Sequence, residues 1–366
     1  MNKEEKFPIV AICYDFDKTL SPDDMQAQGY IQNVNMNVKE FWQKSNSLAH
    51  ENGMDTNLAY MYTMMQEARG NLILNRKALS EYGSKVELFP GVKDWFKRIS
   101  DYGRKVGVVV EHYIISSGLK EMIEGTEMAK NGDFKQIYAS SFYYNERGEA
   151  VWPAQAVNYT NKTQFLFRIQ KGTFDVNDGK VNDYFSPEEI RIPFNHMIYV
   201  GDSDTDVPCM KLVKEKGGYS VGVYNSSSPS PKEKVYKMIN DDRIDYFASA
   251  DYRENQELDI LIKNIIDCIS MSNKLRLKHF RDVAETRQYT SQTITKKVAN
   301  VSDLNKSKSN ITEYAEANPP FNAVDFAKAI RQTTMIANKM AQPIWLQEYN
   351  RRLEALAAFF NPNRNM

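Results

Sequence analysis

Two short apolar segments that each end in a cluster of aspartates constrain the fold of this chain more than any other feature. Residues 7–14 (FPIVAICY) lead into Asp15 and Asp17, and residues 196–201 (HMIYVG) lead into Asp202. A strand that is apolar on both faces is typical of a parallel sheet covered by helices on both sides. Both segments are therefore predicted to be inner strands of one parallel sheet.

The segments between and after these two strands alternate between helix and strand patterns. The helical segments carry charged faces at helical spacing, whereas the strands are rich in valine, isoleucine and tyrosine. The predicted elements are a helix that starts after Pro90-Gly91, a strand over 105–118, a hairpin over 137–152 with its turn at Glu146–Gly148, a helix from Lys162 with Asn161 as its N-cap, strands over 219–224 and 244–249, and a helix over about 256–270. This order predicts an α/β fold with a doubly wound, mostly parallel sheet.

Three regions depart from this alternation. Residues 38–82 form three helical patterns that end near glycines, which predicts a small helical insert outside the sheet. Residues 286–312 are rich in Ser, Thr, Asn and Lys, which favours a linker or a partly disordered stretch. Residues 323–360 are predicted to be helical with an interruption at Pro343.

The charge balance excludes some classes of partner. Lys+Arg and Asp+Glu are equal at 47 each, so the overall balance does not point to nucleic acid or to an anionic membrane. From residue 271 to the end, 15 Lys/Arg stand against 8 Asp/Glu, which leaves a mildly basic tail after a mildly acidic body. An oligomer formed through this C-terminal extension is one expectation.

The cysteines and the first residues indicate a compartment. Cys13, Cys209 and Cys268 lie far apart without a C-x-x-C pair, which argues against a disulfide framework or a zinc site and favours a reducing compartment. The charged start MNKEEKFPIV has no apolar signal region, and no run approaches the ~18 apolar residues of a membrane span. We therefore expect a cytoplasmic protein with no membrane partner.

The two aspartate clusters are predicted to form a metal site. The second cluster holds Asp202, Asp204 and Asp206, and the carboxyl ends of parallel strands meet at one edge of a sheet. Gathered carboxylates need a cation, and an all-oxygen site is typical of Mg²⁺. A single D-x-D is more often a polar turn with capping aspartates, but two clusters at strand ends favour the metal.

Ser116 and Lys162 add the elements of a phosphate site. Ser116 lies near the end of a predicted strand and offers a hydroxyl and the N–H groups that follow it, and Lys162 offers a cation at a helix start. Each residue alone is more often a turn serine or a solvated lysine. Their order between the two aspartate clusters supports a phosphate site.

These motifs resemble those of the haloacid dehalogenase (HAD) superfamily. The resemblance rests on D-x-D-x-T at 15–19, on Ser116 and Lys162, and on GDSDTD at 201–206, and it covers about residues 7–270. The insert before Pro90-Gly91 resembles the C1-type cap of phosphoserine-phosphatase-type members. The resemblance implies a catalytic core over 1–24 and 86–270, a cap over 25–85 and a C-terminal extension over 271–366.

The resemblance also implies a role for each motif residue. Asp15 would attack phosphorus to give an aspartyl-phosphate, and Asp17 would protonate the leaving oxygen and then deprotonate water. The implied metal ligands are Asp15, the backbone carbonyl of Asp17 and Asp202, with Asp206 in support of the metal or of Lys162. The implied phosphate-binding groups come from Ser116, Ser117, Gly118 and Lys162.

Asp24 is the residue expected to face the leaving group. Phosphoserine-type relatives have an acid at this position that meets the amine of the substrate, so Asp24 suggests an amino-acid or amino-alcohol phosphate among small phosphorylated metabolites. Alternatively, Asp24 is a solvated turn residue or pairs with Arg69 or Arg76.

Three other interpretations need different chemistry, and a fourth differs only in the acceptor of the phosphoryl group. Asp17-Lys18-Thr19 also opens the P-type ATPase phosphorylation motif, but Leu20 and Ser21 replace the Gly-Thr expected there. A dehalogenase would use the first aspartate without metal but would lack Asp17. A HAD-like domain without activity could bind a partner through its basic tail, and a phosphotransferase would use the same site as a hydrolase.

Overall fold

β1 (Ile9–Tyr14) is the central strand of a seven-stranded sheet. The strand order is β4-β3-β2-β1-β5-β6-β7, and the pairs are parallel except that β4 runs antiparallel to β3. The other strands are β2 (Val109–Leu119), β3 (Phe134–Tyr144), β4 (Ala150–Gln155), β5 (Met197–Gly201), β6 (Tyr219–Tyr224) and β7 (Tyr246–Ser249). The predicted α/β fold with a mostly parallel sheet is thus confirmed.

The computed structural model describes the backbone of residues 7–315 and the side chains of residues 7–293. The chain divides into two compact units, Met1–Phe280 and Arg281–Met366. The whole sheet and both aspartate clusters lie in the first unit. The helix expected over 323–360, with its interruption at Pro343, lies outside the described residues.

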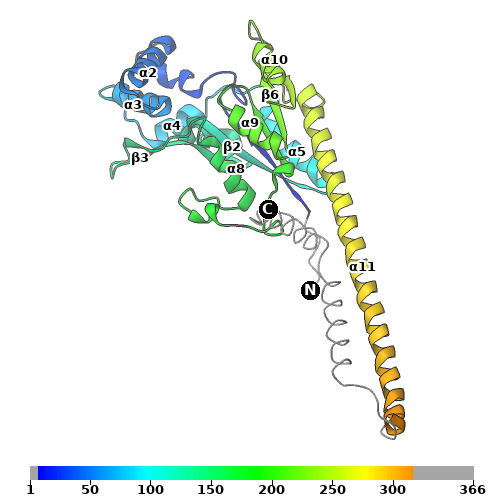
Figure 1. The fold of residues 1–366 in the computed structure, drawn as a ribbon. Helices are drawn as coiled ribbons and strands as arrows, with labels where there is room; N and C mark the ends of the chain where they lie inside the picture. The colour runs from blue at the N-terminus through cyan, green and yellow to red at the C-terminus, as the bar shows by residue number, and fades with distance from the viewer. Residues whose placement is uncertain (1–6, 316–366) are drawn as a thin grey trace, which may run out of the picture. The chain divides into compact units, whose positions relative to one another are not determined.

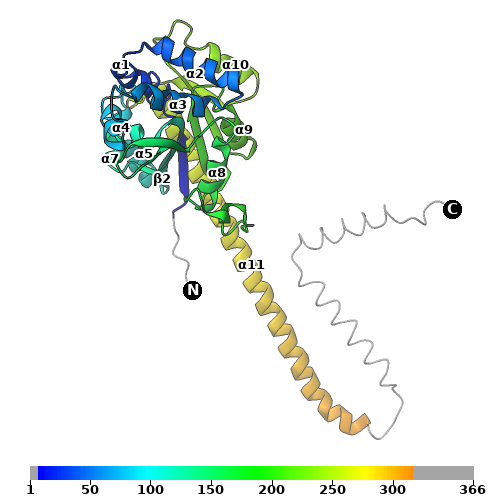
Figure 2. The same ribbon diagram turned by 90° about the vertical axis from the view of Figure 1, so that its left-hand side faces the viewer.

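Helices cover both faces of the sheet (Figures 1 and 2). Val10 and Ile12 of β1 pack in a core with α5 (Val92–Val106), whereas Ala11 and Cys13 pack in a second core on the opposite face. The second core is formed by α8 (Lys162–Lys171), α9 (Val207–Glu215) and α10 (Glu233–Asn240). This alternation along β1 explains why the strand is apolar at every position.

The turn before α5 depends on a glycine. Gly91 has a φ of 84°, and a Cβ added to it would lie 2.3 Å from the backbone nitrogen of Arg253. Only glycine satisfies both the left-handed conformation and this close approach. The Pro90-Gly91 start predicted for the helix is therefore explained by packing against a distant loop.

The helical insert contains one 3₁₀ turn and four α-helices. Helix-capping side chains begin three of them, because Asn37, Asp55 and Asn75 each accept a backbone N–H from the first turn that follows. The elements are η1 (Met25–Ala27), α1 (Tyr30–Asn33), α2 (Val38–Asn52), α3 (Thr56–Ala68) and α4 (Arg76–Gly83). The division into cap and core remains a prediction, since both lie within the first unit.

The insert is joined to the hairpin of β3 and β4 by backbone and side-chain hydrogen bonds. The N–H of Ala150 donates to the carbonyl of Leu74 at 2.8 Å, and the Nδ2 of Asn57 donates to the carbonyl of Val157 at 2.7 Å. These contacts fix the insert over the carboxyl ends of the strands.

The start of α8 confirms Asn161 as the N-cap residue, but its side chain makes no capping bond to the helix. Its Oδ1 accepts the N–H of Asn158 instead. The Oδ1 of Asn158 in turn accepts the N–H groups of Thr160 and Asn161, so the two asparagines close the turn that precedes the helix.

Short elements complete the first unit between the main strands and helices. Residues 173–196, which follow α8, are held by Arg168, whose guanidinium donates to the carbonyls of Thr173, Asp175, Val176 and Asp178. The remaining elements are α6 (Lys120–Glu124), α7 (Glu127–Lys130), η2 (Gly179–Asn182) and η3 (Phe194–His196).

One helix, α11 (Glu257–Ala315), leaves the first unit and extends into the second. The prediction of a linker or disordered stretch over 286–312 is wrong, because this segment is helical throughout. Its sequence contains no glycine or proline, and hydroxyls such as those of Thr286 and Thr290 bond the carbonyl four residues earlier. Among the helices that the structure describes, none combines the length and the apolar character needed to cross a bilayer.

Candidate active site

The site begins where β1 and β5 end side by side. Tyr14 pairs with Val200 in the last step of the β1–β5 register, and the N–H of Asp15 donates to the carbonyl of Val200 at 3.0 Å. Asp202 follows β5 directly after Gly201. The two aspartates therefore leave the same edge of the sheet from neighbouring strands.

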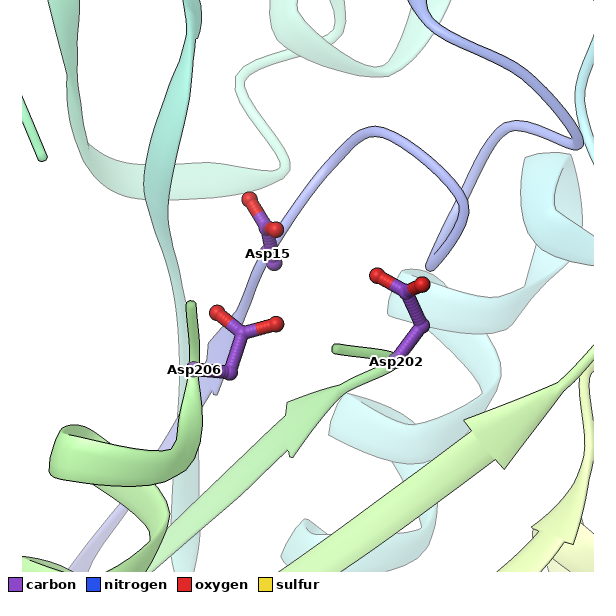
Figure 3. A group of neighbouring side chains, drawn as sticks. All are labelled: Asp15, Asp202 and Asp206. Atoms are coloured by element: carbon purple, nitrogen blue, oxygen red, sulfur yellow. The ribbon is translucent and has the colours of Figure 1, made fainter. Parts of the chain in front are cut away.

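Three aspartates form a buried cluster at this edge (Figure 3). Asp15, Asp202 and Asp206 each offer one carboxylate oxygen, and these oxygens lie within 4.8 Å of one another. Their relative exposures are 6%, 9% and 0%. Asp204, expected in the same cluster, is exposed and does not belong to it.

Lys162 lies between two of these carboxylates. Its Nζ is 3.2 Å from Oδ2 of Asp15 and 2.8 Å from Oδ1 of Asp206, and its side chain is completely buried. Burial opposes the charge, but the two carboxylates raise the pKa of Lys162 well above its ordinary value. The hydroxyl of Tyr199 also donates to Asp206 at 2.9 Å, so Asp206 positions the ammonium.

Lys162 balances only part of the negative charge of the three aspartates. Burial and Asp206 raise the pKa of Asp15 to about 6, and burial with Asp206 and Asp15 raises the pKa of Asp202 to about 8. Several buried carboxylates with a single lysine fit a hard divalent cation that prefers oxygen ligands. The chemistry of these donors therefore fits Mg²⁺.

Asp17 lies beside this cluster and contacts the insert. Its Oδ1 accepts the N–H of Met25 at 2.9 Å. Burial, with the charges of Asp24 and Asp15, raises its pKa well above the ordinary value, so the protonated form is favoured. A Cβ on Gly118 would lie 2.9 Å from Oδ2 of Asp17, which explains why a glycine stands opposite this carboxyl.

The end of β2 supplies hydroxyl and backbone groups. The β2–β3 register shifts between Ile115 and Leu119, and within this irregular end Oγ of Ser116 accepts the N–H of Gly118 at 3.1 Å. The hydroxyl of Tyr60, from α3 of the insert, donates to the carbonyl of Ser117 at 2.8 Å. The insert thus holds the Ser116–Gly118 segment in place.

Asp24 has a cationic partner that the sequence analysis did not consider. Nζ of Lys18 is 2.9 Å from both carboxylate oxygens of Asp24. The expected alternative, Arg76, contacts Glu124 at 3.3 Å instead. Lys18 reaches Asp24 because its backbone adopts a left-handed conformation with a φ of 61°.

A cavity of about 410 Å³ opens beside these groups, and Lys162 and Asp206 lie behind its lining. Asp15, Asp17, Asp24, Ser116 and Asp202 line one side of it. The opposite side comes from the insert and consists of residues that sequence reasoning missed: Gln26, Trp42, Asn46, Thr56, Asn57 and Tyr60. The sequence contained part of the information needed to find them. Trp42 and Asn46 are four residues apart, as are Thr56 and Tyr60, so each pair lies on one face of its helix.

Comparisons with known proteins found several that are similar to this chain. Among curated proteins, one from Borreliella burgdorferi, described as an uncharacterized protein, is 26% identical over 284 residues, which are 70% of this chain and 96% of the relative. A HAD family hydrolase structure from Salmonella enterica serovar Typhi is similar at 15% identity and a TM-score of 0.47, covering 72% of this chain and 73% of that one. A substrate-bound phosphoserine phosphatase structure is similar at 14% identity and a TM-score of 0.43, covering 72% and 99%.

The family comparison covers the site itself. Residues 12–211 match the haloacid dehalogenase-like hydrolases, which is more than half of the 366-residue chain. The match starts within β1, contains Ser116 and Lys162, and ends in α9 after the second aspartate cluster. The chain therefore belongs to the haloacid dehalogenase-like hydrolase family.

Proposed function

We propose that this protein is a Mg²⁺-dependent phosphomonoester hydrolase that acts through an aspartyl-phosphate on Asp15. The observation that carries this proposal is the position of Asp15, whose carboxylate lies at the end of β1 in the cavity and 3.2 Å from the buried ammonium of Lys162. A buried carboxylate beside a fixed cation suits attack on an anionic phosphoryl group, which the cation attracts and neutralises.

The reaction would take two steps. An oxygen of Asp15 forms a bond to phosphorus while the bond from phosphorus to the leaving oxygen breaks, and that oxygen takes the proton of Asp17. Water then attacks the phosphorus of the aspartyl-phosphate, gives a proton back to Asp17 and releases phosphate and the free carboxylate of Asp15. The raised pKa of Asp17 supports its role as the proton donor in the first step.

The phosphoryl oxygens would be neutralised by groups from two elements, α8 and β2. Lys162 supplies a full charge, Ser116 a hydroxyl, and the N–H groups of Ser117 and Gly118 supply backbone donors. The carboxylates of Asp15 and Asp202 and the carbonyl of Asp17 would hold Mg²⁺, with Asp206 in support. When bound, Mg²⁺ supplies positive charge next to the phosphoryl group and lowers the repulsion between that group and Asp15.

The substrate is expected to be a small phosphorylated metabolite. The amine preference suggested by Asp24 depends on an unbalanced carboxylate, but Lys18 contacts both of its oxygens at 2.9 Å. An amino-acid or amino-alcohol phosphate is therefore not part of this proposal. Phosphoryl transfer to an alcohol would use the same residues and would differ only in the acceptor.

The test is hydrolysis of a panel of phosphomonoesters by the full chain, with Mg²⁺ and with EDTA. The Asp15→Asn variant should lose activity by orders of magnitude and keep its circular dichroism spectrum, because the amide retains the shape but cannot attack. Asp204→Asn is the matched control, since Asp204 lies in the same motif but is exposed and outside the cluster. A phosphoryl or fluoroberyllate adduct on Asp17 in place of Asp15 would refute the assignment, and glycerol in the assay would reveal transfer to an alcohol as glycerol phosphate.

A further inference from the structure

We infer that the phosphate of the substrate is esterified to an uncharged polar group, such as a sugar or a nucleoside, and that Gln26 and Trp42 form hydrogen bonds with that group. This inference rests on the proposed function, since it names the class of the leaving group at the same site. It follows from three features of the residues that line the cavity and from the size of the cavity.

The first feature is the absence of charge from the part of the wall that the insert provides. The residues of 25–85 that line the cavity are amides, a hydroxyl and aromatic rings, with no charged side chain among them. An unpaired carboxylate would be needed to attract an amine, and an unpaired cation to attract a second anionic group. This wall therefore favours a neutral leaving group.

The second feature is a buried donor without a hydrogen-bond partner, next to an amide that lines the same wall. The indole Nε1–H of Trp42 is buried and has no hydrogen-bond partner within the described residues. Gln26 is 2% exposed and lines the cavity beside it. Buried polar groups in folded proteins are nearly always paired, so the unpaired indole N–H in the cavity wall indicates a ligand that pairs with it. An amide accepts and donates and an indole donates, which suits hydroxyl and carbonyl groups.

The third feature is the balanced charge on Asp24. The bidentate contact from Lys18 makes a neutral pair at the side of the cavity where an amine would otherwise bind. An amine would have to displace the ammonium of Lys18 from this carboxylate. A neutral hydroxyl-bearing group can bind without breaking the pair.

The size and shape of the cavity suit a leaving group with a ring. Its volume of about 410 Å³ lies within the range that encloses drug-sized ligands and exceeds what a phosphate on a two-carbon alcohol needs. Trp42 packs edge-on against Tyr60 with ring centroids 6.0 Å apart, and Tyr60 is fixed by its bond to Ser117. These rings form an apolar wall against which a planar base or the face of a sugar can pack.

The experiment compares five phosphomonoesters on the full chain: a hexose phosphate, a nucleoside 5′-monophosphate, phosphoserine, phosphoethanolamine and methyl phosphate. The wild type should show its highest kcat/KM on the hexose phosphate or the nucleotide. Whichever of these two esters has the larger kcat/KM identifies the neutral group as a sugar or as a nucleoside. Gln26→Met nearly keeps the side-chain volume and Trp42→Phe keeps an aromatic ring, and each variant removes a hydrogen-bonding group. Each should reduce the preference for the neutral ester over methyl phosphate by roughly three- to tenfold, the usual effect of one lost hydrogen bond.

Ser45→Ala is the matched control. Ser45 lies on the same helix as Trp42, and its Oγ is likewise buried without a hydrogen-bond partner, but it does not line the cavity. This variant should keep the wild-type preference, which separates loss of substrate contacts from disturbance of the insert.

Two results would overturn the inference. One is a wild-type preference for phosphoserine or phosphoethanolamine over both neutral esters. The other is an equal loss on methyl phosphate and on the neutral ester in both Gln26→Met and Trp42→Phe. Calorimetric binding of the same esters to the Asp15→Asn variant measures the preference without turnover, so failure of the proposed hydrolysis and failure of the preference remain separate results.

Discussion

Replacing Lys162 by methionine should destabilise the first unit strongly, because it leaves two buried carboxylates without their cation. At an effective dielectric constant of about 20, the separations of 3.2 Å to Asp15 and 2.8 Å to Asp206 correspond to roughly 5 and 6 kcal/mol of gross attraction. Much of this attraction is offset by the cost of burying the ammonium. Removing one partner of a buried ion pair nevertheless costs about 3–5 kcal/mol, since the other charge stays buried.

The expected effect can be measured by calorimetric unfolding of the full chain in EDTA at pH 8. At about 2–4 °C per kcal/mol, Lys162→Met should lower the Tm of the first unit by about 6–20 °C. The difference in Tm between the wild type and Lys162→Met should shrink as the pH falls toward 5. The folded-state pKa of Asp15 is already raised to about 6, and loss of the ammonium raises it further, so the folded state binds protons at a pH where the unfolded chain does not.

Two further variants make this test specific. Lys162→Met with Asp206→Asn should recover part of the lost stability, because the amide removes one uncompensated charge. Lys234→Met, which removes an exposed lysine from the rim of the same cavity, should leave the Tm nearly unchanged. A Tm for Lys162→Met within about 2 °C of the wild type, or no gain from the added Asp206→Asn, would show that Lys162 does not compensate these carboxylates.

Two other predictions concern the metal and the C-terminal helix. Mg²⁺ should raise the Tm more at pH 8 than at pH 5.5, because the raised pKa values of Asp15, about 6, and of Asp202, about 8, leave these ligands protonated at low pH; equal increases at both pH values would contradict this. In the absence of metal, the same two groups make the protein less stable as the pH rises through their folded-state pKa values. A chain that ends at Phe280 should keep hydrolysis of a small phosphate ester. A chain that ends at Asn255 should fail to fold, since it loses the buried side chains of Ile262, Ile266 and Ile269. If the chain that ends at Phe280 folds but has no activity, the second unit is needed to complete the site.

The convergence of Asp15 and Asp202 could be predicted because it follows from sheet topology alone. Two inner strands that run parallel must end at the same edge, and β1 and β5 are direct neighbours. The position of Lys162 follows less directly, since it depends on where α8 begins. The contacts of Lys162 with the aspartates could be inferred only because Lys162 and the three other motifs, D-x-D-x-T, Ser116 and GDSDTD, together resemble those of one family.

The contacts that local sequence could not reveal depend on the competition between neighbouring groups. Asn161 occupies the N-cap position of α8, but only the folded turn decides that its Oδ1 bonds the N–H of Asn158 and not a helix N–H. In α11, the polar composition of 286–312 suggested disorder, but composition does not show that hydroxyls can bond within the helix or that no residue interrupts it. The unpaired indole N–H of Trp42 depends on how the insert packs over the core, which is a tertiary property.

The conformation of Lys18 connects the local sequence to the charge of the cavity. After Asp17 the chain turns sharply, and the N–H groups of Thr19, Leu20 and Ser21 all approach the carbonyl of Phe16, at 3.2, 2.8 and 3.2 Å. Such a turn needs one residue with positive φ, a position where glycine or asparagine costs least and lysine adds strain of order 1 kcal/mol. Lysine at this position therefore indicates that its side chain is needed, and the contact it makes is the bidentate one with Asp24. The same backbone turn that places Asp17 beside Asp15 thus also places a cation on Asp24, and this pair leaves that side of the cavity without net charge.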